Sequence, residues 1–87
     1  MAQIATGKII GTDEYINVET ELSLSLTANK LYAVQIQGEA MICESATQPT
    51  TGGTYWNTLQ PFGYKKESAY LWVKINEGEE ISINFTE

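Results

Sequence analysis

The side chains that most often perform chemistry in proteins are sparse in this 87-residue chain. It contains no histidine, no arginine and a single cysteine, Cys43. General acid–base catalysis near neutral pH most often uses histidine, and a thiol nucleophile needs a neighbouring base or cation. The sequence also lacks a Gly-x-Ser-x-Gly turn, a Walker A loop and a Gly-x-Gly-x-x-Gly fingerprint. We therefore expect no enzymatic activity and no cofactor.

Acidic side chains are the next candidates, and calcium is the ligand that they suggest. Asp13 and Glu14 are followed by Glu19 and Glu21. An EF-hand loop places its ligands at alternate positions around a central glycine, and this spacing does not match it. Zinc would lack its usual cysteine and histidine ligands. We interpret the carboxylates as solvated charges at turns and strand edges and expect no metal site.

The overall charge argues against two classes of partner. Five lysines face eleven carboxylates, which leaves a formal net charge of −6. Binding to DNA or RNA requires clustered cations, and only Lys65 and Lys66 are adjacent, so we expect no nucleic-acid partner. An acidic surface also disfavours anionic membranes. The sequence shows neither an apolar run of membrane-spanning length nor a signal-peptide pattern, which predicts synthesis in a cytoplasm.

Hydrophobic residues recur with period two along most of the chain, which predicts half-buried strands. The predicted strands comprise residues 4–10, 15–18, 22–26, 32–37, 40–44, 62–65, 69–75 and 81–86. Their inward rows are expected to contain Leu24, Val34, Ile36, Leu71, Val73, Ile81 and Ile83. Short strands separated by turn signals predict a single all-β domain over residues 1–87. Its expected form is a small antiparallel β-sandwich or barrel-like jelly roll of seven to eight strands.

The connections carry their own predictions. Gly78, within residues 76–79, has the freedom for positive φ that a hairpin-length loop requires, and Gly38 suits a tight turn or bulge. Residues 45–54 are small and polar and form a long loop, which in a compact domain is often functional. Cys43 lies in an apolar run, and we interpret it as a small buried residue rather than a reactive thiol. With one cysteine, no internal disulfide is possible.

Aromatic side chains are the strongest candidates for a contact surface. The candidate interface or ligand contacts are Tyr55, Trp56, Tyr64, Tyr70 and Trp72. The first three flank the long loop, where they are able to stack on a sugar ring or fill a pocket of a partner. Trp56, Leu59 and Phe62 also suit an anchor that holds the loop over one end of the sandwich, which is the interpretation that we favour for Trp56 and Phe62.

The predicted strand over residues 69–75 carries large aromatic side chains on the face that points away from the core. Its alternation places Tyr70 and Trp72 on the face opposite Leu71 and Val73. If the second pair faces the core, two large aromatic rings lie on the outer face. Either the long loop or another subunit is expected to cover them.

The order of these features resembles a family. Residues 32–38 read Tyr-Ala-Val-Gln-Ile-Gln-Gly, and a Pro/Gly-rich loop, a Leu-Gln-Pro-Phe step and a Tyr-Leu-Trp-Val strand follow before Glu-Gly-Glu-Glu-Ile-Ser-Ile. Residues 31–86 resemble the small β-sandwich structural proteins of tailed bacteriophages: head-decoration, head-fibre and tail-associated modules. The resemblance implies no catalysis, self-association (often as a trimer), docking on other virion proteins, and a virion location after synthesis in the bacterial host cytoplasm.

Two functions are thus expected from the sequence. The first is a non-enzymatic virion structural or interaction module that forms a homo-oligomer, either a dimer or a trimer. The alternative is a carbohydrate-binding module that uses the aromatic residues of the 45–64 region, Tyr55, Trp56 and Tyr64. The first predicts oligomers in isolation, whereas the second predicts a monomer that responds to glycans.

Overall fold

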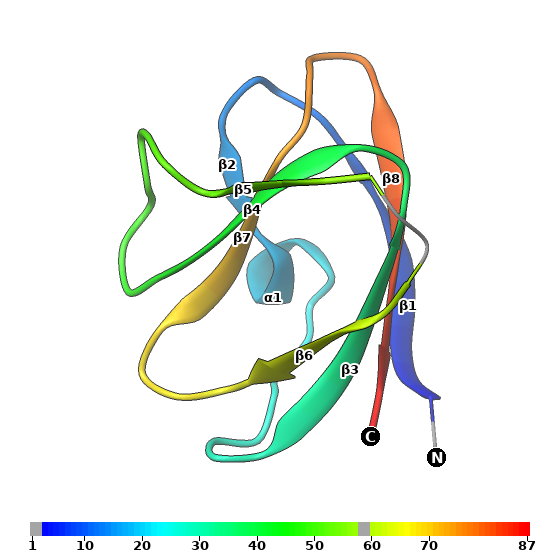
Figure 1. Ribbon diagram of the computed structural model, residues 1–87, viewed down its shortest axis with the longest axis vertical. Coiled ribbons are helices and arrows are strands. Elements are labelled where there is room, and N and C mark those ends of the chain that lie inside the picture. The colour runs from blue at the N-terminus through cyan, green and yellow to red at the C-terminus, as the bar shows by residue number, and fades with distance from the viewer. Residues whose placement is uncertain (1–2, 58–59) are drawn as a thin grey trace.

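The protein is an all-β domain in the computed structural model, which describes residues 3–57 and 60–87 (Figure 1). Its elements are β1 (Gln3–Ile10), β2 (Tyr15–Asn17), α1 (Val18–Glu21), β3 (Leu31–Gln37), β4 (Ala40–Ser45), β5 (Thr54–Trp56), β6 (Phe62–Lys65), β7 (Tyr70–Lys74) and β8 (Glu80–Thr86). This confirms the predicted fold class. Within the described residues, no helix has both the length and the apolar character needed to cross a membrane.

The strands form two four-stranded antiparallel sheets. We name them sheet A, with the order β1-β8-β3-β6, and sheet B, with the order β2-β7-β4-β5. Among the described strands, consecutive ones lie in different sheets except for β4 and β5, which are neighbours in sheet B. This arrangement is that of a jelly roll, in which two antiparallel sheets enclose one core. Each sheet has two edge strands, β1 and β6 in sheet A and β2 and β5 in sheet B.

The core consists of alternate residues from the inner faces of both sheets. The residues that are at most 2% exposed include Ile9, Val34, Ile36, Leu71, Val73, Ile75, Ile81, Ile83 and Phe85. The predicted inward rows of β3, β7 and β8 are therefore confirmed. Removing these apolar surfaces from water is the main favourable contribution to folding, since no disulfide is possible.

The segment over residues 22–26 is not the strand that its alternation predicted. Its side chains do alternate, with Leu26 buried and Leu22 and Leu24 half-buried. Its amides, however, bond to α1: Leu24 N–H donates to the Glu19 carbonyl at 2.8 Å, and Leu26 N–H donates to Glu19 Oε1 at 2.9 Å. Local partners on α1 satisfy these amides, so the segment packs inward without joining a sheet.

The turn over residues 76–79 also differs from its prediction. Gly78 has positive φ (84°), as expected, but β7 pairs within sheet B whereas β8 pairs within sheet A. The turn therefore crosses between sheets and is not a β-hairpin. The actual hairpin joins β4 to β5 through residues 46–53, and β5 lies in a stretch that carried no strand prediction. The three residues of β5 are polar or aromatic, and so short a segment shows no hydrophobic alternation from which to predict a strand.

Two leucines allow a matched test of the core. Leu71 is 2% exposed and Leu31 is 65% exposed, although both lie on strands. We expect Leu71→Ala to lower the free energy of unfolding by about 2–5 kcal/mol, because it leaves a cavity between the sheets. Leu31→Ala should change it by less than about 0.5 kcal/mol. Urea unfolding followed by circular dichroism measures both, and equal losses would show that the inner face is misassigned.

Candidate interaction surfaces

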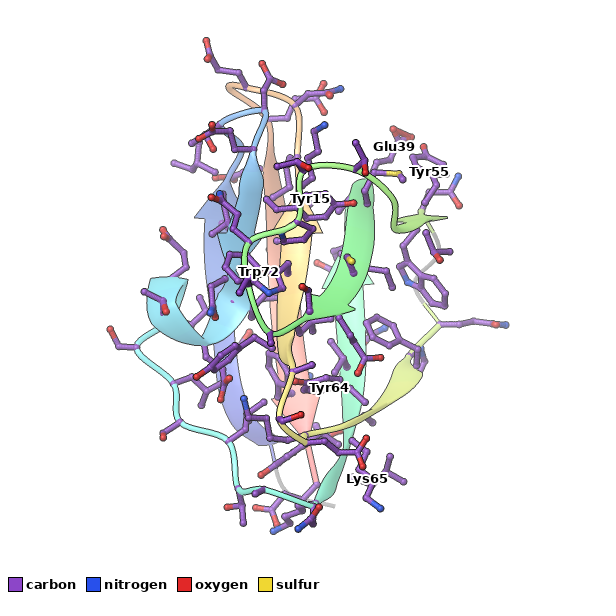
Figure 2. All side chains as sticks on the ribbon, turned by 90° about the vertical axis from the view of Figure 1, so that its left-hand side faces the viewer. Tyr15, Glu39, Tyr55, Tyr64, Lys65 and Trp72 are labelled. Atoms are coloured by element: carbon purple, nitrogen blue, oxygen red, sulfur yellow. The ribbon has the colours of Figure 1, made fainter. Side chains whose placement is uncertain are left out.

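The loop of the β4–β5 hairpin, residues 46–53, covers part of the outer face of sheet B. Trp72 Nε1 donates a hydrogen bond to the Ser45 carbonyl at 2.9 Å, and Tyr15 donates its hydroxyl hydrogen to the Gly52 carbonyl. Gln48 Nε2 donates to the Tyr15 carbonyl at 2.8 Å. Figure 2 shows the loop passing over both rings. The loop therefore covers Trp72 within one chain, which is the first of the two alternatives.

Cys43 shares this outer face. It is half-buried and lies opposite Trp72 in the register of β4 and β7, so it does not lie in the core as expected. The reason is parity: Ala40, buried, and Ile42, packed on the core, take the inward positions of β4, which places residue 43 on the other face.

Tyr70 is the more exposed of the two outward aromatic residues of β7, at 39% exposure, whereas Trp72 is half-buried. The Lys66 ammonium lies 3.8 Å from the centre of the Tyr70 ring, a cation–π contact. The same ammonium forms an ion pair with Glu19 Oε2 at 2.7 Å, and both charged side chains are about nine-tenths buried. Tyr70 is thus part of a local charged cluster.

Glu19 connects three parts of the chain. One carboxylate oxygen binds Lys66, which follows β6, and the other accepts the amide of Leu26. These bonds hold the 22–26 segment and the end of β6 against α1. The carboxylate that was expected to be a solvated charge is therefore a buried structural group. Among the described residues, no cluster of three or more potential metal ligands is present.

The three aromatic residues proposed to bind a glycan do not share one surface. Tyr55 is 53% exposed, Trp56 is half-buried, and Tyr64 is 1% exposed. The Trp56 and Phe62 rings meet edge to face at 4.9 Å between centroids, as predicted for an anchor. Leu59, the third member of that anchor, lies outside the described residues. Trp56 Nε1 is buried and has no hydrogen-bond partner among the described residues.

Tyr55 and Tyr64 differ in chemistry as well as in exposure. Tyr55 lies beside Glu39 (Figure 2), and their hydrogen bond raises the pKa of the Tyr55 phenol. Burial, together with the charges of Glu19 and Glu44, raises the pKa of Tyr64 to about 12. Tyr64 donates its hydroxyl hydrogen to the Ala69 carbonyl at 3.2 Å. Tyr64 is consequently a core residue that is neutral near pH 7, and only Tyr55 of the three is a surface ring.

An open strand edge is the first feature that sequence reasoning missed. Gly11 N–H donates to the Glu79 carbonyl at 2.7 Å, and residues 5–10 of β1 pair with β8 in the same register, after a shift between Gln3 and Ala5. Antiparallel hydrogen bonds alternate along a strand, so odd-numbered residues of β1 bond to β8. Thr6, Lys8 and Ile10 therefore direct their backbone N–H and C=O groups away from the sheet. Within the described residues, no partner for these backbone groups is found.

The second missed feature is a groove on the opposite flank of the sandwich. It has a volume of about 300 Å³ and lies between β6 of sheet A and the β4–β5 pair of sheet B. Its lining residues are Ile42, Cys43, Glu44, Gly53, Thr54, Phe62 and Leu71. β5 pairs only with the first three residues of β4, which leaves Glu44 exposed beyond the pairing. No sequence period indicates such an edge, because edges depend on strand order.

Comparisons with protein-family models, with curated proteins and with solved structures found no match for this chain.

The buried ion pair allows a matched test of electrostatics. Lys66–Glu19 is about nine-tenths buried, whereas Lys8–Glu80 spans 3.7 Å with both side chains more than half exposed. We expect Lys66→Ala to lower the free energy of unfolding by about 3 kcal/mol, because Glu19 is left buried without its cation. Lys8→Ala should cost less than about 0.5 kcal/mol. Chemical denaturation measures both, and a Lys66→Ala protein of unchanged stability would contradict the structural role of the pair.

Proposed function

We propose that this chain is a non-enzymatic structural or interaction module that acts through self-association and docking on a scaffold, as in a tailed-phage virion. The observation that carries the proposal is the open edge of β1. At eight residues, β1 is long for an edge strand, and its outward backbone groups have no partner among the described residues. A long unpaired edge is a template for pairing with another chain.

Two copies of β1 are complementary to each other. In antiparallel pairing, each strand both donates and accepts, so the same residues on both copies satisfy one another about a two-fold axis. Pairing would join two copies of sheet A into one continuous sheet. In the register that pairs all three outward residues, Ile10, which is 60% exposed, would lie opposite Thr6 of the second copy. We therefore propose a dimer through β1 in place of an interface centred on Trp72.

One charge opposes this pairing. A lysine on an edge strand is a common protection against association, and Lys8 lies on the outer face of β1. Its charge is partly balanced by Glu80 at 3.7 Å. In the two-fold pairing the Lys8 side chains of the two copies would face each other, each beside its own Glu80, which leaves the edge able to pair but limits the strength of the contact. We accordingly expect association at micromolar rather than nanomolar concentration.

The architecture and the family resemblance point in the same direction. Jelly rolls with two four-stranded sheets occur in viral capsid domains and in lectins. A shared fold does not establish a function, so this support is by analogy. The resemblance of residues 31–86 to phage structural modules favours the first of these settings. A virion location and virion partners form part of the proposal on the same basis.

Carbohydrate binding is the second candidate, and the exposure of Tyr55 favours it. Tyr55 borders a shallow pocket with Glu39, Lys74 and Asn76, whose polar groups suit sugar hydroxyls. A single ring provides one stacking surface, whereas the sequence suggested three. A glycan that shifts the Tyr55 ring resonances of a monomeric protein would place this function ahead of self-association.

Sedimentation equilibrium tests the proposed self-association. Between about 1 and 300 μM, we expect the mean mass to rise from monomer toward dimer. Lys8→Pro removes an amide from the open edge without removing a bond to β8, so this variant should remain monomeric with an unchanged β spectrum. Lys8→Ala keeps the amide and should still dimerise. A wild-type monomer at every concentration, or dimerisation of the Lys8→Pro variant, would contradict the proposal.

A further inference from the structure

The groove between β6 and the β4–β5 pair has the features of a site for one more strand. β6 bonds to β3 through its even-numbered residues, because Lys66 N–H donates to the Lys30 carbonyl at 3.2 Å in the continuing register. Gly63 and Lys65 consequently direct their backbone groups toward the open side. Figure 2 shows Lys65 on β6, at the edge of the molecule away from β4. An extended segment paired with β6 would become the fifth strand of sheet A.

The floor of the groove is apolar. Ile42 and Leu71 come from the inner face of sheet B, and Phe62 comes from β6. A strand added to sheet A directs alternate side chains toward the inner face of sheet B. A volume of about 300 Å³ is ample for one aliphatic side chain of the added strand. Covering these three residues provides apolar burial in addition to the backbone bonds.

Glu44 determines the charge of the partner. It lies opposite Leu71 in the register of β4 and β7, so it occupies an inner-face position, yet it is exposed because β5 does not extend that far. Glu44 is itself one of the residues that line the groove. Among the described residues, Glu44 has no ion pair. A cation on the added strand would provide one.

We propose that this groove binds an extended segment of a scaffold protein by strand addition, with an aliphatic residue on the floor and a lysine or arginine two residues away facing Glu44. Two residues of a strand span about 7 Å, the separation between successive side chains on one face. The proposal rests on the docking half of the proposed function and names the chemistry of the docked segment. The self-association half uses β1, at the other edge of sheet A.

The test uses two synthetic peptides, acetyl-Thr-Val-Thr-Lys-Thr-amide and its reverse order, acetyl-Thr-Lys-Thr-Val-Thr-amide. They are titrated into ¹⁵N-labelled protein, and amide shifts are followed by NMR. One of the two should bind with a dissociation constant below about 1 mM. The largest shifts should occur at Gly63, Lys65 and Glu44, with a change at the Trp56 indole, whose ring contacts Phe62 at 4.9 Å between centroids.

Removing the charge of Glu44, or of the peptide lysine, tests whether the two groups contact each other. Glu44→Gln should weaken the lysine peptide about threefold and leave a peptide with threonine in place of lysine unchanged. Glu14→Gln is the matched control, because Glu14 is also exposed but precedes β2, at the opposite edge of sheet B. The proposal is overturned by an absence of saturable shifts, or by a Glu44→Gln variant that binds the lysine peptide as tightly as the wild type.

The Lys8→Pro variant separates this inference from self-association. Peptide binding to the groove of that monomeric variant would support docking independently of the dimer, whereas peptide binding by a wild-type protein that never dimerises would support docking while contradicting the dimer. A wild-type protein that dimerises but binds neither peptide would support the dimer and contradict docking at the groove. Shifts at Gly63 and Lys65 that depend on protein concentration in the absence of peptide would assign the groove to a second copy, and so would overturn the scaffold segment.

Discussion

The structure depends on burying the inner rows of two sheets against each other, because a chain with one cysteine cannot form an internal disulfide. Among the described residues, ten inward residues of these rows are at most 2% exposed, and they come from β1, β3, β6, β7, β8 and the residue after β7. With nearly every connection crossing between the sheets, each inward row meets residues that are distant in the sequence. Most of the favourable free energy of folding therefore comes from the layer between the sheets. The outer faces and the edge strands contribute less to stability, and they are the parts of the domain that can contact partners.

Local hydrogen bonds then decide which outer groups remain available. The β4–β5 loop accepts a hydrogen bond from Tyr15, and Ser45 at the end of β4 accepts one from Trp72. The Lys66 ammonium lies over Tyr70 while it pairs with Glu19. These contacts occupy most of the aromatic face that the sequence suggested as an interface. What remains besides the Tyr55 ring is backbone, including the open edge of β1 and the open edge of β6. The proposed functions accordingly depend on strand pairing, with side chains providing selectivity.

Period two was sufficient to predict the strands that face the core, because one-sided burial imposes that pattern on residues such as Val73 and Ile83. It failed for Leu24, where the same alternation serves a segment whose amides bond to Glu19. It also could not distinguish Tyr64 from Tyr55, since burial of a tyrosine depends on which strand lies above it. The edges were beyond prediction, because they follow from the order of strands across a sheet, to which residues far apart in the chain contribute.

The central claim is that the outward backbone of β1 pairs with a second copy. Amide hydrogen exchange tests it directly, at protein concentrations well below and well above the expected association. At low concentration, the amides of Thr6, Lys8 and Ile10 should exchange rapidly while those of Gly7 and Ile9 are protected by β8. At high concentration, all five should be protected. Rapid exchange of the first three amides at both concentrations would contradict the account.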